Sequence, residues 1–301
     1  MPGLNMDTGI PFEAGKTYRL RIINTSAFAQ FYIWMDGHQM RVIEADGTDT
    51  EEYPVDYINL SVAQRYSVLV TARNDTDMNY LITAKFDETM FDTFSPDLQL
   101  NYTTLIKYAD GNPVAETTVH QELNAFRDDY LVPLEVEPEL TPARPIELGV
   151  WFDTFDNGQN RAAFNNITFQ MPTNPTIFTA TTMGDNAALT DVYGRQTNAH
   201  ILEHNEIVDI MLINWDANAH PVHLHGHKFQ IVRHAIDVAS NDTTLNPSHV
   251  ENLANPMRRD TVIIPAGGAV NLRIRADNPG VWILHCHIGA PALCALAHAK
   301  D

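Results

Sequence analysis

The sequence predicts an all-β protein that contains two copies of one β-sandwich. Two observations lead to this fold class. Short segments alternate apolar and polar residues between turn residues, and the same series of segments occurs twice along the chain. The stretch TYRLRIIN at 17–24 is typical of these segments, because it is rich in β-branched and aromatic residues. Helix signals are few and short, so a sandwich or a barrel is the expected architecture.

The expected strands follow one another closely in each half of the chain. In the first half they are 17–24, 39–44, 57–62, 65–71 and 79–84, separated by turn residues such as Gly47 and Pro54. In the second half they are 147–152, 166–170, 199–203, 206–213, 227–233, 261–264, 269–275 and 281–287.

The two halves repeat each other in sequence. RLRIIN (19–24) parallels DIMLIN (209–214), GHQMRVI (37–43) parallels GHKFQIV (226–232), QRYSVLVTARN (64–74) parallels GAVNLRIRADN (268–278), and NYLITAK (79–85) parallels VWILHCH (281–287). The order is kept, and the second copy has one extra loop around 234–259. Two copies of the same sandwich explain this order.

The stretch between the two series predicts the domain boundaries. RDDYLVPLEVEPELTPARP at 127–145 is rich in proline and acidic residues, which is typical of a linker. A chain of 301 residues can hold two domains of roughly 150 residues each. We therefore expect domains at 1–130 and 146–301, joined by a linker at 131–145.

Composition limits the classes of partner. The chain has 19 Lys and Arg against 38 Asp and Glu, a formal charge of −19, which argues against nucleic acid and anionic membranes and favours cations. No run of about eighteen apolar residues predicts a membrane span. Six N-x-S/T sequons hint at secretion. A secreted chain needs a signal peptide, and the first residues do not form one, so we expect the natural N-terminus to differ from the one in this sequence. Two cysteines do not indicate a disulfide framework.

Two short blocks in the second copy hold residues at metal-ligand spacing: HPVHLHGHKF at 220–229 and LHCHI at 284–288. In a β-strand, alternate residues share a face. His285 and His287 can therefore point one way, while Cys286 between them points to the opposite face.

The first block has a matching arrangement. His223 and His225 can share one face of a strand, and His220 is free to join the thiolate of Cys286 on the other. The pattern predicts an imidazole cluster and a thiolate site back to back. Imidazoles with one thiolate suit copper, whereas zinc accepts the same ligands and is the main chemical alternative.

These two blocks resemble the C-terminal copper motifs of multicopper oxidases, the family of laccases, ascorbate oxidases and ferroxidases. The resemblance covers nearly the whole chain, which is similar to the second and third cupredoxin domains of a three-domain enzyme. It implies two tandem cupredoxin-like Greek-key β-sandwiches. It also implies the family's chemistry, in which a type 1 copper takes electrons from substrate and a trinuclear copper cluster reduces O₂ to water.

The resemblance assigns a role to each ligand residue. It implies type 1 ligands at His220 and Cys286, a type 2 ligand at His223, and type 3 ligands at His225, His285 and His287. In the first copy, Phe31, Trp34 and Asp36 stand where the second copy has the histidines of the first block, and Thr83-Ala84-Lys85 replaces His-Cys-His. We therefore expect the first copy to have the scaffold without copper ligands.

The chain departs from the family pattern in two places. The family motif continues as HCHIxxH, and its last histidine is a type 1 ligand. In this sequence Pro291 stands at that position and Leu296 falls at the axial position. The residues that follow also differ from the family, which predicts an altered or shortened C-terminal end. The family's first domain, which carries the other half of the cluster histidines, is also outside this sequence. We therefore do not expect a complete trinuclear cluster in the isolated chain.

Within the family, the chain most resembles fungal iron-uptake ferroxidases, through DNPGVWILHCHI (277–288), PMRRDT (256–261), AQRYSVLV (63–70) and RAAFNNITF (161–169). The acidic residues that bind Fe²⁺ in that group align with Asp36, Asp153 and Asp216, with Asp36 where glutamate is usual. Fe²⁺ is a hard cation that favours carboxylate oxygens, and carboxylates stabilise Fe³⁺ still more.

The resemblance therefore implies a secreted or cell-surface ferroxidase that works in iron uptake beside an iron permease, with Fe²⁺ and O₂ as substrates. Two alternatives stay open. A laccase-like oxidase would act on phenols or amines and would not depend on Asp153 and Asp216. A truncated product would bind copper or nothing and would have no oxidase activity.

Overall fold

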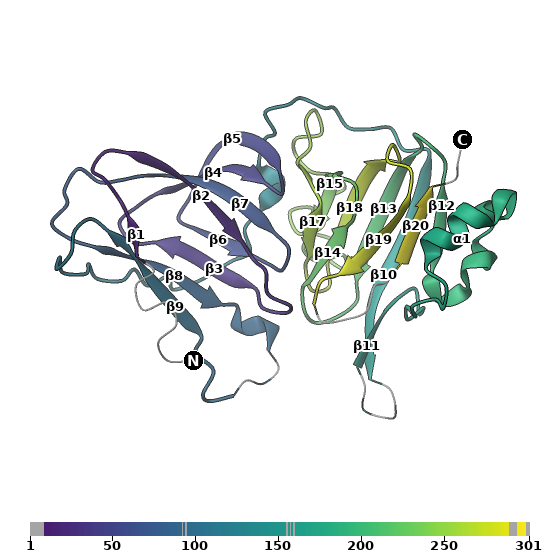
Figure 1. The fold of residues 1–301 in the computed structure, drawn as a ribbon, viewed down its shortest axis with the longest axis horizontal. Helices are drawn as coiled ribbons and strands as arrows, with labels where there is room; N and C mark the ends of the chain where they lie inside the picture. The colour runs from purple at the N-terminus through teal and green to yellow at the C-terminus, as the bar shows by residue number, and fades with distance from the viewer. Residues whose placement is uncertain are drawn as a thin grey trace. The chain divides into compact units, whose positions relative to one another are not determined.

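The computed structural model describes residues 9–288, except for 92, 94, 155, 157 and 159, together with 294–298. For Asp153, Thr154, Asn160 and 294–298 it describes the backbone only. The chain divides into two compact units, Met1–Arg127 and Asp128–Asp301. Both consist mainly of β-strands (Figure 1), which confirms the predicted all-β fold class. Within the described part, no helix is both long enough and apolar enough to span a membrane.

The first unit packs two sheets against each other. The five-stranded sheet has the order β1 (Ile10–Pro11), β9 (Asn101–Lys107), β8 (Tyr80–Phe86), β3 (Phe31–Met35) and β6 (Tyr57–Leu60). The four-stranded sheet has the order β2 (Thr17–Ile23), β7 (Arg65–Thr71), β4 (Met40–Ala45) and β5 (Thr48–Val55). Alternation along each strand fills the core, where Val42, Val68 and Ile58 are fully buried.

The second unit is built the same way with more strands. Its six-stranded sheet has the order β11 (Asn160–Phe164), β10 (Arg144–Thr154), β13 (Ile207–Asn214), β18 (Ala269–Arg275), β15 (Phe229–Ala235) and β16 (Arg258–Arg259). Its five-stranded sheet has the order β12 (Ala199–Leu202), β20 (Cys294–His298), β19 (Val281–Cys286), β14 (His220–Leu224) and β17 (Thr261–Ile264).

Helical segments are short. The α-helix of the described residues, α1, spans Thr176–Thr182 and buries none of its side chains. The 3₁₀ turns are η1 (Glu88–Met90), η2 (Asp128–Tyr130), η3 (Gly184–Ala188), η4 (Thr190–Tyr193) and η5 (Arg195–Thr197).

The topology reproduces the sequence repeat. The order β1-β9-β8-β3-β6 of the first unit corresponds to β12-β20-β19-β14-β17 of the second. Asn24 and Asn214 end matching strands, and each donates from its side-chain amide to backbone carbonyls: Asn24 to Leu60, and Asn214 to Ile264. The internal repeat is therefore structural as well as sequential.

The segment at 131–145, expected as a linker, lies along the second unit. Leu131 is buried, Leu140 N donates to Oε1 of Gln230 (2.9 Å), and the Arg258 guanidinium donates to the backbone oxygen of Glu135. Just before it, the carboxylate of Asp128 pairs with Arg259, whose side chain is fully buried. Prolines favour an extended backbone in segment 131–145. The hydrogen bonds attach this segment to the sheet.

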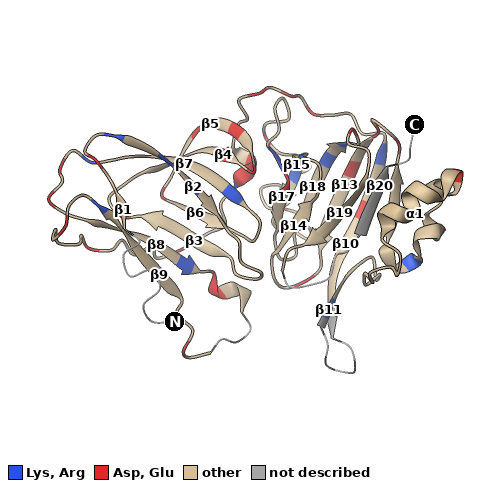
Figure 2. Ribbon diagram, in the orientation of Figure 1, with Lys and Arg blue, Asp and Glu red and all other residues tan. Residues whose placement is uncertain are grey.

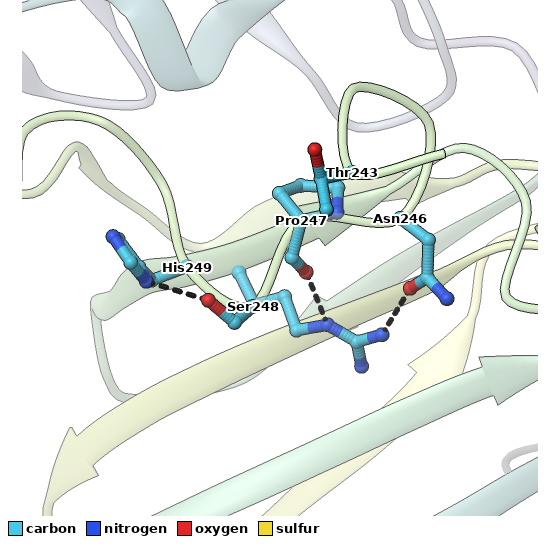
Figure 3. Close-up of a pocket in the computed structure, with 6 residues that line it drawn as sticks. Thr243, Asn246, Pro247, Ser248 and His249 are labelled. Atoms are coloured by element: carbon cyan, nitrogen blue, oxygen red, sulfur yellow. Dashed lines mark hydrogen bonds between the residues drawn. The ribbon is translucent and has the colours of Figure 1, made fainter. Parts of the chain in front are cut away.

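The extra loop of the second copy follows β15 and surrounds a surface pocket (Figure 3). Arg233 donates from Nε to the oxygen of Pro247 (2.9 Å) and from Nη2 to Oδ1 of Asn246 (2.7 Å). Ser248 Oγ lies 2.8 Å from Nδ1 of His249. The guanidinium thus fastens the loop to β15.

Acidic residues, which are in excess in the composition, gather along individual strands. β5 carries Asp49, Glu51 and Glu52, all exposed, and Figure 2 shows the acidic positions on this strand. Arg41 of β4 pairs with Glu52 across the strands (2.7 Å), an exposed pair of little net stability.

Candidate metal centre

Strands β14 and β19 bring the two histidine blocks side by side. They pair antiparallel with Val222 opposite Cys286, His223 opposite His285, and Leu224 opposite Leu284. Because faces alternate, Cys286 joins the buried core cluster, and His223 and His285 lie on the other face, where they are only partly buried. The two faces predicted from the sequence are therefore the faces that the structure forms.

Four imidazoles gather on the outer face. Ring centroids are 4.6 Å apart for His223 and His225, 4.7 Å for His285 and His287, and 5.1 Å for His225 and His285. Nε2 of His225 lies 3.0 Å from Nε2 of His285. Two ring nitrogens that face each other at this distance can both turn lone pairs toward one cation.

Hydrogen bonds to the opposite ring nitrogen orient these imidazoles. Nδ1 of His223 lies 2.9 Å from the backbone oxygen of Asp260, and Nδ1 of His285 lies 3.0 Å from that of Cys286. A carbonyl oxygen only accepts, so each Nδ1 donates and each Nε2 keeps its lone pair. Metal-binding histidines in proteins are held in this way.

Burial favours the neutral form of three of these imidazoles. Burial, with smaller contributions from the nearby His287 and His225, lowers the pKa of His285 to about 4. Desolvation likewise lowers the pKa values of His225 and His287. Neutral imidazole is the form that binds metal, so at neutral pH these residues are ready to act as ligands.

The thiolate site lies on the inner face. Nδ1 of His220 is 3.7 Å from Sγ of Cys286, and its Nε2 is 2.9 Å from Oδ2 of Asp216. The Phe152 ring stacks on the His220 imidazole at 4.5 Å. The carboxylate accepts the Nε2 proton, so the lone pair of Nδ1 faces the sulfur.

Electrostatics at this site disfavour a thiolate without a cation beside it. Burial, with a smaller contribution from the charge of Asp216, raises the pKa of Cys286 to about 12, although the backbone N–H of Ile288 opposes the shift. Burial also lowers the pKa of His220 against the effect of Asp216. A cation between the two atoms would supply the charge that a buried thiolate needs.

The candidate ligands among the described residues lie in pairs, and each pair suits copper. One imidazole with one thiolate, and facing imidazoles on the outer side, are the donors that copper prefers. Within the described part of the chain, no three His, Cys, Asp or Glu side chains are arranged so that all of them could hold one metal ion. Pro291 lies outside the described residues, and of Cys294, Leu296 and His298 only the backbone in β20 is described.

Two of the three candidate acidic residues lie at one end of a sheet in the second unit. Asp153 and Asp216 follow Val150 and Asn214, which lie opposite each other on the parallel strands β10 and β13, so both backbones lie at the same end. Asp36 belongs to the first unit, is 2% exposed, and accepts a hydrogen bond from the backbone of Thr118 (3.0 Å).

Sequence reasoning did not predict that Trp282 packs against the first histidine block. The six-membered ring of Trp282 lies under Gly226, where an added Cβ would come within 2.4 Å of it. Trp282 Nε1 donates to the oxygen of Asn278 (2.8 Å), whose side-chain amide donates to the oxygen of Gly226 (2.9 Å). The signal was the glycine inside the first histidine block, directly after His225, since Gly226 has a φ of 71°.

The chain matches two family models, each described as multicopper oxidase, over residues 3–111 and 166–293. It is 48% identical over 300 residues to "Iron multicopper oxidase fer1" of Mycosarcoma maydis, covering 99% of this chain and 48% of that protein. It is 42% identical over 281 residues to "Iron transport multicopper oxidase FET3" of Saccharomyces cerevisiae, covering 90% and 44%. The chain thus spans about half the length of the curated relatives it matches.

Solved structures agree with the sequence matches. The crystal structure of Fet3p, described as a multicopper oxidase that functions in iron import, superimposes with a TM-score of 0.89 at 39% identity over 97% of this chain and 57% of that one. A laccase from Botrytis aclada superimposes with a TM-score of 0.79 at 26% identity over 96% and 53%.

Proposed function

This chain belongs to the multicopper oxidase family, and we propose that it supplies the iron-oxidising site of a ferroxidase together with half of the ligands for its O₂-reducing cluster. The resident cofactor of the family is copper, which accepts single electrons and passes four of them to O₂ to form water. His220 and Cys286 would hold the copper nearest the substrate. His223, His225, His285 and His287 would hold copper of the cluster.

The observation that carries this proposal is the carboxylate of Asp216 beside His220 (2.9 Å). Both hydrogen bonds to this carboxylate, from His220 and from the backbone N–H of Asn218, go to Oδ2, which leaves Oδ1 for a cation. A carboxylate binds Fe²⁺ as a hard ligand and favours Fe³⁺ still more, so it promotes loss of the electron. Asp216 would thus bind Fe²⁺ and also orient His220, the copper ligand through which the electron of the iron passes. Asp153, at the same strand end, would add a second carboxylate, and Asp36 remains a candidate for a third.

The test compares two substrates in an active, copper-loaded protein that contains this sequence. We expect the double variant Asp153→Asn, Asp216→Asn, in which an amide oxygen can still accept the hydrogen bond from His220, to lose at least about tenfold in kcat/KM for Fe²⁺ while oxidation of a phenol changes little. Unchanged Fe²⁺ kinetics would overturn the ferroxidase proposal.

A second candidate, a laccase-like oxidase of phenols or amines, is favoured by one feature. Trp151 and Trp215 stack at 5.6 Å and are 44% and 50% exposed, and Trp215 directly precedes Asp216. Exposed indoles bind aromatic rings by stacking. The same experiment separates the two, because Trp215→Ala would reduce phenol oxidation and spare Fe²⁺ oxidation.

We also propose that the protein works on the secretory route or at the cell surface, with an iron permease as partner that takes up the Fe³⁺. For residues 1–301 alone we propose copper binding without four-electron oxidase activity. Sustained O₂ consumption with Fe²⁺ by the isolated chain, above a metal-free control, would contradict this last point.

A further inference from the structure

The turn that follows the first histidine strand has a counterpart in the first unit. Gly226 follows β14 with one residue between them, and Gly37 follows β3 in the same way. Both glycines have a left-handed backbone, with φ of 71° and 64°. Each lies against an aromatic ring of the neighbouring strand, so that an added Cβ would come within 2.4 Å of Trp282 in the second unit and within 2.5 Å of Tyr80 in the first.

The histidine after each glycine closes the turn from the other side. The ring of His227 stands edge-on to Trp282 with centroids 6.0 Å apart, and His38 stands edge-on to the matching tyrosine at 5.0 Å. Nδ1 of each histidine donates to the backbone oxygen of the residue before the glycine. That residue is His225 in the second unit (3.3 Å) and Asp36 in the first (2.7 Å).

A third contact holds the oxygen of each glycine. The side-chain amide of Asn278 donates to the oxygen of Gly226 (2.9 Å), and Nη1 of Arg73 donates to that of Gly37 (3.2 Å). In the second unit Nε1 of Trp282 also donates to the backbone oxygen of Asn278 (2.8 Å). Both units therefore fix the residue before the glycine by the same turn, and only in the second unit is that residue a candidate metal ligand.

His225 depends on this turn more than the other imidazoles of the cluster do. Nδ1 of His223 and Nδ1 of His285 each donate to a backbone oxygen, whereas no hydrogen bond joins Nδ1 of His225 to any residue that the structure describes. Its side chain is exposed, and its Nε2 lies 3.0 Å from Nε2 of His285. Because Nδ1 of His285 carries the proton of that ring, its Nε2 accepts this bond and Nε2 of His225 donates it.

We propose that Trp282 is a positioning residue for His225, and that by packing under Gly226 it keeps Nε2 of His225 directed at Nε2 of His285. Without the indole, the glycine is free to adopt other backbone conformations, and the exposed imidazole moves with it. A ligand that is already in place loses less conformational freedom when the metal binds, so Trp282 raises the affinity of the pair for metal. This inference rests on the proposed role of His225 as a copper ligand.

The first test needs no metal. In the 301-residue chain with ¹⁵N-labelled histidine, NMR signals of the two rings are assigned from their loss in His225→Gln and His285→Gln. We expect Trp282→Leu to break the bond between the rings, so that the Nε2 signal of His285 moves to the position of a ring nitrogen without a hydrogen bond. Trp282→Phe keeps a ring under the glycine and should preserve the signal.

Tyr80→Leu is the matched control, because it removes the corresponding ring from the turn of the first unit. It should leave the His285 signal where it is in the unaltered chain. A loss of packing that acts only on stability would affect both variants alike, and would not move the signal of one ring nitrogen.

The second test uses Zn²⁺ as a diamagnetic probe, because zinc accepts imidazole ligands. The same ring signals are followed during a zinc titration. We expect Trp282→Leu to raise the dissociation constant for zinc at His225 and His285 at least about tenfold, the usual effect of removing a residue that orients a metal ligand. Tyr80→Leu should leave this constant unchanged.

Asn278→Asp keeps the indole and removes the donor to Gly226, so it replaces Trp282→Leu if that variant does not fold. It should move the His285 signal in the same direction. The inference is overturned if the variant used leaves this signal unchanged, or if Tyr80→Leu moves it equally. If zinc does not shift the ring signals of the unaltered chain, the proposed ligand role of His225 fails, and the metal-free signals still decide whether Trp282 positions the ring.

Discussion

Nδ1 of His220 lies 3.7 Å from Sγ of Cys286, although the two residues are 66 positions apart. The antiparallel pairing of β14 with β19 places Val222 opposite Cys286, and His220, two residues earlier on the same face, then reaches the sulfur. This relationship joins the candidate substrate site to the histidine cluster, because the residues on either side of Cys286 belong to that cluster.

The thiol of Cys286 should be almost unreactive in the metal-free protein. Its pKa is raised to about 12 and its side chain is buried, so very little thiolate exists at pH 8. In a Cys294→Ser variant, which keeps one thiol, we expect a disulfide reagent to react more than about a hundredfold slower with the folded chain than with the chain in urea. Equal rates would contradict the buried site.

The metal-free fold should lose stability as the solution becomes acidic. The pKa of His285 is about 4 in the folded chain and near 6.5 when unfolded, so its contribution is complete above pH 6.5 and is lost as the pH falls toward 4. Urea midpoints at pH 7.5 and 5 measure this loss. His285→Gln should reduce the difference between the two, whereas His204→Gln, at an exposed position, should preserve it.

Gly226 should be the least replaceable glycine of the site. Alanine there needs a φ of 71° and drives its Cβ against Trp282. Gly267 is the matched control, because it has a φ of 65° and open space around it. We expect Gly267→Ala to cost about 1–2 kcal/mol and Gly226→Ala to cost about 1–3 kcal/mol more, measured by urea unfolding. Equal costs would mean that Trp282 gives way.

The ion pair between Asp128 and Arg259 should be essential to the second unit. Arg259 is fully buried, so Asp128→Asn removes a negative partner from a buried positive charge. We expect a loss of about 3–5 kcal/mol in the free energy of unfolding. Asp75→Asn, which breaks the exposed pair with Arg73, should cost at most about 1 kcal/mol. Similar losses for the two variants would argue against a buried pair.

The sequence predicted the strands and the ligand faces because both depend on local alternation. A strand turns each residue to the face opposite its neighbour, so His285, Cys286 and His287 divide between two faces wherever the strand lies. The repeat between 19–24 and 209–214 predicted two sandwiches for the same reason, since matching alternation buries matching residues. The family and the all-β fold could therefore be inferred without coordinates.

Only the tertiary structure decided which neighbours these residues meet. In the sequence, Asp216 and Asp36 are both aspartates beside aligned motifs. In the structure, Asp216 accepts a hydrogen bond from His220, whereas Asp36 is buried in the first unit. Segment 131–145 has the composition of a linker, and only the structure shows that it is bonded to the second unit. Burial, ion pairing and sheet neighbours arise between residues distant in the chain, so no local pattern specifies them.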